Sequence, residues 1–183
     1  MSDTLQGSLQ VRLATQYNNI LAGGLGTTGV SIGPNFQLTF TDGVAIDQAD
    51  KLWASQNRVL NSAATENIDV YNFGAIDIGT GPGEDPLGNA LALVSAVGLI
   101  VISDPASVGV LIVGGEGSAA AWSAPFNNVN TGAVVVRPGG ILTMWAPGSV
   151  GFVIGGASTN HLLKMLASGG AVTYSIYVIG RSA

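Results

Sequence analysis

Short apolar runs separated by turn residues recur along most of the chain. Residues 134–156 show this pattern most clearly, because two Pro-Gly breaks divide three runs rich in Val, Ile and Phe. Proline presets φ for a turn and glycine supplies φ > 0, and a helix does not survive two such breaks at this spacing. Each run is about five residues long, which is ordinary strand length. The pattern therefore predicts a meander of three short β-strands.

Further runs of the same kind lie on both sides of this stretch. They cover residues 53–60, 68–71, 90–102, 108–113, 161–166 and 172–179. The last run alternates cleanly, which places Val172, Tyr174, Ile176 and Val178 on one face of a strand. Many short strands at regular spacing are typical of a β-sandwich and not of a βαβ fold. We therefore expect residues 47–183 to form an all-β domain, a jelly-roll-like antiparallel β-sandwich.

The first 46 residues follow a different pattern. Alternating apolar positions predict one or two short strands, at residues 9–13 and 36–40. Between them, residues 22–33 are rich in Gly and Thr, a composition typical of a flexible arm or a long loop. Such a segment cannot build a core of its own, so we expect a neighbouring subunit to cover it. Residues 1–46 are therefore predicted to form an extended N-terminal arm.

The composition points to a partner. The chain has 183 residues, enough for one domain with a buried core, but only 9% of them are charged. Because an ordinary soluble domain has about 25% charged residues, we expect exposed apolar area and hence an interface. The alternative is a Gly-rich monomer whose surface is Ser, Thr and Asn. Candidate interface residues come from the arm and from a later loop or edge strand: Leu21, Leu25, Val30, Ile32, Phe36, Trp122 and Phe126.

The charge and the cysteine count exclude several classes of partner. The net charge is −5 and the six basic residues are scattered, which argues against binding to nucleic acid. The absence of cysteine rules out disulfides and thiolate metal sites. Residues 86–103 are uncharged and nearly long enough to span a membrane, but Pro86, Gly88 and Gly98 favour buried strands instead. We therefore expect neither nucleic acid nor membrane as a partner.

No catalytic pattern stands out, and we expect neither enzymatic activity nor a cofactor. His161 is the single histidine, and a lone histidine on a strand is more often structural than part of a triad. Glu84 and Asp85 follow a Gly-rich loop that has no phosphate-loop ending. These two carboxylates are candidate Ca²⁺ ligands, although adjacent acids in a loop are usually just solvated. Trp53, Trp122 and Trp145 are either packing anchors or a platform for stacking a sugar.

A set of motifs in fixed order supports a family resemblance. The motifs cover residues 47–53 (DQADKLW), 64–70 (ATENIDV), 86–89 (PLGN), 113–115 (VGG), 136–140 (VRPGG), 146–148 (APG) and 172–180 (VTYSIYVIG). From Asp47 onward the chain resembles a group of small virion proteins of tailed bacteriophages, the head decoration or cement proteins. The chain departs from the family pattern in the loop at 75–85, which is richer in glycine and acidic residues.

The resemblance implies a structural virion protein on the capsid exterior, assembled in the host cytoplasm. Such a protein binds across the seams of the major capsid protein and stabilises the shell. The expected partners are the major capsid protein and further copies of the chain, with a trimer as one candidate. A jelly roll at the tail or a vertex that binds a receptor or carbohydrate is the alternative, and it requires exposed aromatic residues in a loop cluster.

Overall fold

The chain folds into two compact units. The computed structural model describes residues 4–12, 15–20, 27–32, 35–74, 83–85, 88, 90–148 and 150–182. Gln6–Phe40 form one unit, and Thr41–Ala183 together with the residues before Gln6 form the other. In these described residues, regular structure is β-strand except for one turn of 3-10 helix, η1 (Ala124–Phe126). The all-β prediction is confirmed.

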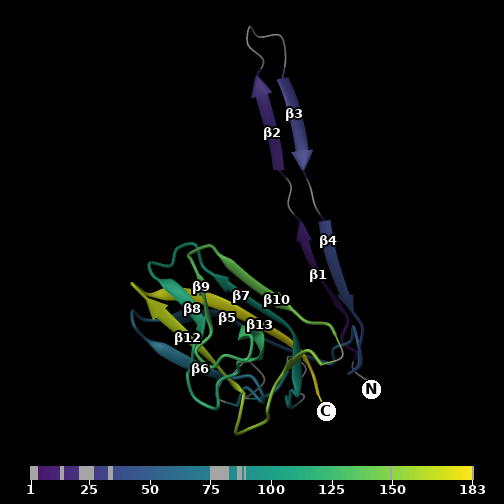
Figure 1. Ribbon diagram of the computed structural model, residues 1–183, viewed down its shortest axis with the longest axis vertical. Coiled ribbons are helices and arrows are strands. Elements are labelled where there is room, and N and C mark those ends of the chain that lie inside the picture. Colours follow the sequence, from purple (N-terminus) through teal and green to yellow (C-terminus); the bar gives the residue numbers. More distant parts are fainter. Residues whose placement is uncertain are drawn as a thin grey trace. The chain divides into compact units, whose positions relative to one another are not determined.

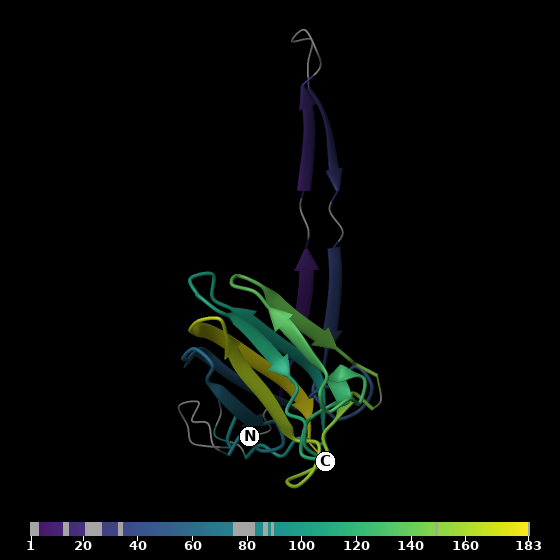
Figure 2. The same ribbon diagram turned by 60° about the vertical axis from the view of Figure 1, so that its left-hand side comes forward.

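The larger unit is an antiparallel β-sandwich (Figure 1). Sheet I has the order β10-β7-β13-β5, with β11 also paired to β7, and sheet II has the order β6-β12-β8-β9. The strands are β5 (Lys51–Leu60), β6 (Thr65–Asp69), β7 (Ser95–Ser103), β8 (Val110–Gly114), β9 (Ala133–Val136), β10 (Ile141–Trp145), β11 (Phe152–Val153), β12 (Leu162–Ser168) and β13 (Val172–Arg181). Figure 2 shows the two layers from another side.

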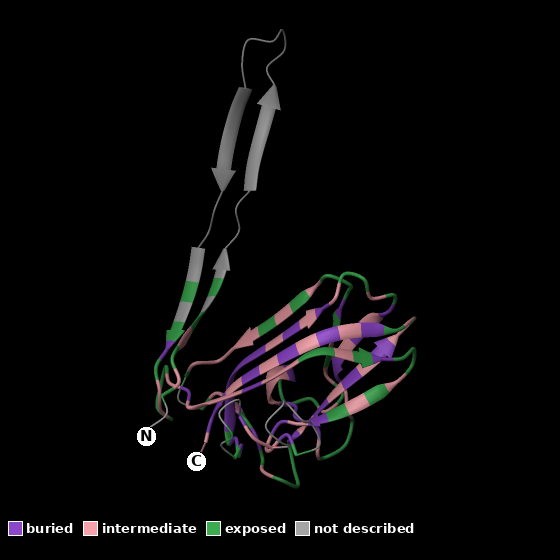
Figure 3. Cartoon of the chain, turned by 180° about the vertical axis from the view of Figure 1, so that it is seen from behind, coloured by how far each residue is buried: buried purple, intermediate pink, exposed green. Residues whose placement is uncertain are grey.

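Alternation along the strands builds the core between the sheets. In β13 the positions alternate between buried and half-buried, and Val172, Tyr174, Ile176 and Val178 are buried as the sequence predicts. Figure 3 shows the same banding along the sandwich strands. Within the core, Trp53 stacks on Phe73 with ring centroids 4.3 Å apart. The sandwich is thus closed by its own side chains, as expected for two sheets packed face to face.

The stretch at 134–156 forms three strands, but not a meander. Strand β9 pairs with β8 in sheet II, whereas β10 and β11 both pair with β7 in sheet I. The Pro-Gly turn after Val136 carries the chain from one sheet to the other. The prediction of adjacent pairing is wrong because local pattern fixes where strands begin and end, while their partners depend on which faces can be buried together.

The smaller unit contains more strand than predicted. It holds β1 (Gly7–Arg12), β2 (Thr15–Ile20), β3 (Thr27–Ile32) and β4 (Asn35–Phe40), where one or two strands were expected. Strand β1 pairs with β4 and β2 pairs with β3, both antiparallel. Half of the stretch predicted as a loop is therefore β3, because cross-strand pairing outweighs the low strand preference of its glycine. We call β1 to β4 the arm ribbon.

Candidate interaction surface

Two of the predicted contact residues lie in the core. Only 2% of Trp122 is exposed, its indole N–H donates to the carbonyl oxygen of Val153 (2.9 Å), and its ring meets Phe152 edge-on. Phe126 is also buried, and a Cβ on Gly132 would lie 2.7 Å from the Cβ of Phe126. Their prediction as an exposed interface is wrong. Burial removes a large apolar area from water, so aromatic residues of a loop are stabilised by packing against the sandwich.

The other predicted contacts belong to the arm. Leu21 and Leu25 lie outside the described residues. Val30 and Ile32 are in β3, and Phe36 is in β4. The register sets Val30 opposite Tyr17, Ile32 opposite Thr15 and Phe36 opposite Val11. All three residues therefore lie in paired β-strands. The prediction that Val30 and Ile32 lie in a loop is wrong.

Strand register divides the arm ribbon into an apolar and a polar face. Cross-strand partners share a face and neighbours along a strand alternate. In the sheet of β1 and β4, the pairs Gly7/Phe40, Leu9/Leu38 and Val11/Phe36 alternate with Ser8/Thr39, Gln10/Gln37 and Arg12/Asn35. In the sheet of β2 and β3, the pairs Thr15/Ile32, Tyr17/Val30 and Asn19/Thr28 alternate with Gln16/Ser31, Asn18/Gly29 and Ile20/Thr27. Apolar residues therefore fall mainly on one side of each sheet, although Asn19/Thr28 is a polar pair on that side and Ile20 is an aliphatic residue on the other.

Burial at the base of the arm ribbon agrees with this division. Gln10, Gln37 and Thr39 on the polar face are exposed, while Phe40 on the opposite face is buried. The ring of Phe40 lies over Gly7, where an added Cβ would be 2.5 Å from the ring atom Cζ. The arm ribbon thus consists of two amphipathic two-stranded sheets, and the described residues of this unit form no second layer on them.

A second surface covers the outside of sheet I. Strand pairing arranges its residues in rows across β5, β13, β7 and β10: Leu52, Ile179, Gly98 and Trp145; Ala54, Tyr177, Ile100 and Thr143; Ser175, Ile102 and Ile141; and Val59 with Thr173. We call this set the sheet I outer face. All of these residues are neutral and most are apolar, although none of them contributes to the core between the sheets.

Trp145 and Gly98 meet at one end of the sheet I outer face. A Cβ on Gly98 would lie 2.5 Å from the indole carbon Cζ3 of Trp145 and 3.5 Å from the Cδ1 of Ile179. The indole therefore lies over the glycine, beside Ile179, and remains partly exposed. Trp145 does not form a sugar-stacking pair with Trp122, because Trp122 is buried in the core.

The outside of sheet II has a different character. Its central row is apolar, with Val135, Ile112 and Leu166 side by side. It also carries charges of both signs, since Lys164 and Asp69 lie on the same face. The two outer faces of the sandwich therefore differ in charge.

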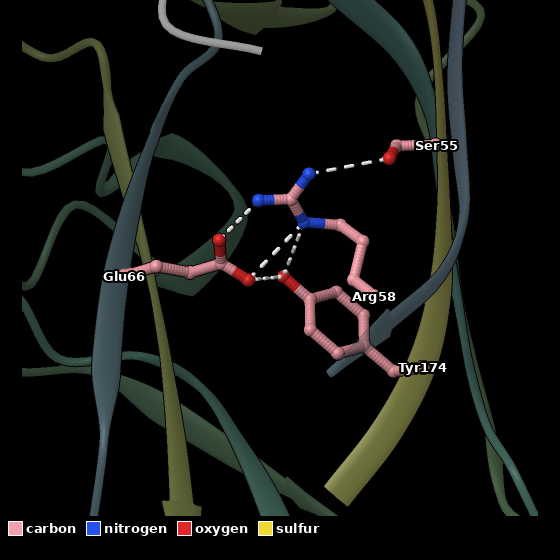
Figure 4. A network of polar contacts seen from close by, with 4 residues as sticks. All are labelled: Ser55, Arg58, Glu66 and Tyr174. Carbon is pink, nitrogen blue, oxygen red and sulfur yellow. Dashed lines mark hydrogen bonds and ion pairs between the residues drawn. The ribbon is translucent and has the colours of Figure 1, made fainter. Parts of the chain in front are cut away.

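A polar network joins the two sheets from within (Figure 4). Arg58 on β5 forms an ion pair with Glu66 on β6 and donates to the hydroxyl of Ser55. The hydroxyl of Tyr174 on β13 donates to Glu66. Burial, followed by the hydrogen bond to Glu66, raises the pKa of Tyr174, while the bond to Glu66 raises the pKa of Arg58. The network links both sheets by charge-assisted hydrogen bonds.

Arg181 fixes the segment that follows the arm in sequence. Its guanidinium is buried and donates to the carbonyl oxygens of Gln48 (2.9 Å), Pro147 (2.8 Å) and Gly148 (2.7 Å). Burial lowers the pKa of Arg181, and the carboxylate of Asp47 opposes that effect. Sequence reasoning treated Arg181 as one scattered charge, because nothing local indicates that three carbonyl groups from distant loops surround it.

The remaining chemical candidates stand apart from one another. His161 is buried, and its Nδ1 has no hydrogen-bond partner within the described chain. Glu84 forms an isolated antiparallel β-bridge with Ala90 through the backbone, and Asp85 is buried. Across the described ranges, no three His, Cys, Asp or Glu residues gather at a common point. No helix of that part of the chain has the length and apolarity needed to cross a membrane.

Comparison with known proteins gives no relatives: no family model, curated protein or solved structure matches this chain. Evidence for function therefore comes from the molecule's own surfaces and from its sequence motifs.

Sequence reasoning missed the sheet I outer face because its residues come from four separated strands. One signal was available in β13, where Tyr177 and Ile179 occupy positions that a solvated strand would give to polar residues.

Proposed function

We propose that this chain is a structural virion protein of a tailed bacteriophage. It decorates the capsid exterior and stabilises the shell by binding across the seams of the major capsid protein. The arm ribbon carries the proposal, because it is a separate unit with an apolar face and only two strands in each of its sheets. A lone two-stranded sheet is at best marginally stable in water. Binding to a neighbouring protein supplies the missing layer.

The sandwich supports the same proposal through its strand order. Consecutive strands mostly change sheet, which sets β5 beside β13 and β6 beside β12. Two interleaved Greek keys of this kind make a jelly roll, an architecture common in viral capsid proteins and in lectins. The motifs from Asp47 onward add the resemblance to decoration proteins. A protein that binds only the assembled shell stabilises that shell by mass action.

Capsid attachment tests the proposal. Deleting residues 6–40 should abolish binding to capsids that lack this protein, while the sandwich keeps its fold by circular dichroism. A finer comparison uses Leu38→Glu and Gln37→Glu, which add the same charge at neighbouring positions on opposite faces of β4. Only Leu38→Glu should weaken attachment, because a carboxylate on the apolar face would have to be buried.

Two outcomes would contradict the proposal. Equal attachment of the two Glu variants would mean that the apolar face of the arm ribbon does not contact the shell. A copy number of only a handful per particle, measured by mass spectrometry against the major capsid protein, would favour the tail or vertex alternative. Hundreds of copies are expected for a protein that covers capsid seams.

A further inference from the structure

The sheet I outer face is a neutral, largely apolar surface on a negatively charged molecule. Its residues come from β5, β13, β7 and β10, and its exposed positions include Val59 and Ile141. We propose that this face is the contact between two copies of the chain, packed face to face about a two-fold axis. The proposal uses no residue of the arm ribbon and does not rest on the proposed attachment to a capsid.

The size of the face fits a pair of copies. Strands β5, β7 and β13 have nine or ten residues and are about 30 Å long, whereas β10 has five residues and is about 17 Å long; neighbouring strands are about 4.8 Å apart. The footprint is roughly 500 Å² on each copy, so a pair buries roughly 1,000 Å² or more. A specific interface should exceed about 1,000 Å², which places this contact at the lower end of the stable class.

The charge distribution favours the same occupant. Each copy carries a net charge of −5, so two copies repel each other, and this repulsion is weakest when the surfaces that meet carry no charge. The rows of the sheet I outer face contain no charged residue. The outside of sheet II, in contrast, includes Asp69 and Lys164. Of the two sandwich faces, the first is the one on which two identical anionic chains can meet without burying charge.

The face also holds preformed anchors for a partner. Trp145 lies over Gly98 beside Ile179, so little side-chain freedom remains to be lost on binding. Tyr177 occupies the middle row between Ala54 and Ile100. Trp and Tyr are the residue types that most often dominate interface energetics. In a two-fold arrangement each anchor is used twice, because the same patch is present on both copies.

Face-to-face packing of two such sheets is ordinary protein architecture. Sheets stack about 10 Å apart with their strands inclined by roughly 30°. The small residues Ala54 and Ser175 leave room for larger side chains of the opposite copy. Sheet II remains outside this contact.

Matched charge insertions test the proposal in the full-length protein. Ile141→Glu alters the sheet I outer face, whereas Val135→Glu alters the outside of sheet II; the two residues are 65% and 54% exposed and both lie on edge strands. Because both side chains are exposed, neither change should unfold the sandwich. A second pair, Thr143→Glu and Thr65→Glu, repeats the comparison at exposed threonines on the same two faces.

Sedimentation velocity at protein concentrations from about 1 to about 100 μM should distinguish the variants by their oligomeric state. We expect the unaltered chain, Val135→Glu and Thr65→Glu to reach twice the chain mass of 18.4 kDa. Ile141→Glu and Thr143→Glu should weaken the dimer about tenfold or more, since each would bury two carboxylates across the axis. Leu38→Glu, which tests the arm ribbon, should retain the dimer.

Three results would overturn the proposal. The first is an unaltered chain that stays monomeric over the whole range, as it would if its own arm or only a capsid protein covered the face. The second is a dimer or larger oligomer that Ile141→Glu leaves unchanged. The third is an oligomer lost in Leu38→Glu and kept in Ile141→Glu, which would assign self-association to the arm ribbon.

Discussion

Tyr174 shows how a single buried hydroxyl can connect two sheets. Only 1% of the residue is exposed, yet its hydroxyl reaches both Glu66 and Arg58. A buried polar group of this kind is costly unless it is hydrogen-bonded, and here every member of the network has a partner. Removing one member should therefore affect stability more than loss of an exposed ion pair, which contributes little.

The raised pKa of Tyr174 predicts a loss of stability at alkaline pH. Burial keeps the phenol protonated in the folded chain, whereas an unfolded tyrosine ionises near pH 10. Above about pH 10 the unfolded state therefore loses a proton that the folded state retains, and the free energy of unfolding falls as pH rises. We expect Tyr174→Phe to flatten this fall, as measured by urea unfolding at pH 8 to about pH 11.

The same variant should be less stable at neutral pH, by about 1–2 kcal/mol, because Glu66 and Arg58 each lose a hydrogen bond. The prediction is contradicted if the alkaline decline is equally steep in Tyr174→Phe and in the unaltered protein. In that case other groups would cause the decline.

Residue identity alone did not separate core from surface. Trp122 and Phe126 sit among Gly, Ala, Ser and Pro in the sequence, and this setting is typical of an exposed loop. Trp122 contacts the distant Val153 and Phe152, and Phe126 lies against Gly114 and Gly132, so the burial of both residues requires the folded sandwich. In β13 the core residues were predicted correctly, because period-two alternation within one strand needs no knowledge of its partners.

At the scale of elements, strand positions were easier to predict than strand partners. The runs around the Pro-Gly breaks became β9, β10 and β11 as expected, but these strands belong to two sheets. In the arm, β3 was hidden because Gly and Thr residues dominate its neighbourhood, and β2 has few apolar residues. Cross-strand pairing in register stabilises β2 and β3, although the sequence of each strand alone has no clear strand pattern.

The close approach of β10 to β7 leads to a prediction for Gly98. A valine there would place Cβ 2.5 Å from the Trp145 indole, so Gly98→Val should displace the ring and destabilise the sandwich by about 1–3 kcal/mol. Thermal unfolding and tryptophan fluorescence would report the loss of stability and the more solvated indole.

A double-mutant cycle isolates the cause. In a Trp145→Ser background the valine at position 98 should cost much less, because the clashing ring is gone. If the penalty is the same with serine as with tryptophan at position 145, strand backbone effects and not the indole would be responsible.

At the scale of the whole molecule, low charge was the informative sequence property. It predicted an interface but not its place, because the neutral residues concerned are spread from Leu52 to Ile179. Only the pairing of four strands gathers them on one face. Composition predicted an arm over residues 1–46 and a sandwich from residue 47, whereas the smaller compact unit ends at Phe40. The two faces of the arm ribbon required its register.

A neutral contact between anionic copies predicts an unusual response to salt. Raising NaCl from about 0.05 to about 0.5 M should leave dimerisation unchanged or strengthen it, since salt screens the repulsion between copies and there are no ion pairs in the contact to weaken. Sedimentation equilibrium at both salt concentrations would measure this. A dimer about tenfold weaker in high salt would indicate that charged groups form the contact.

The register of the arm ribbon also sets a rule for its length. In both ladders each step outward on one strand matches a step inward on the other, and the two residue numbers of every pair add up to 47, from Gly7 with Phe40 to Ile20 with Thr27. Adding a single residue pair would swap the apolar and polar faces of everything beyond it. An insertion that keeps the apolar and polar faces in place must therefore add residue pairs two at a time. Each such insertion lengthens the arm by about 7 Å.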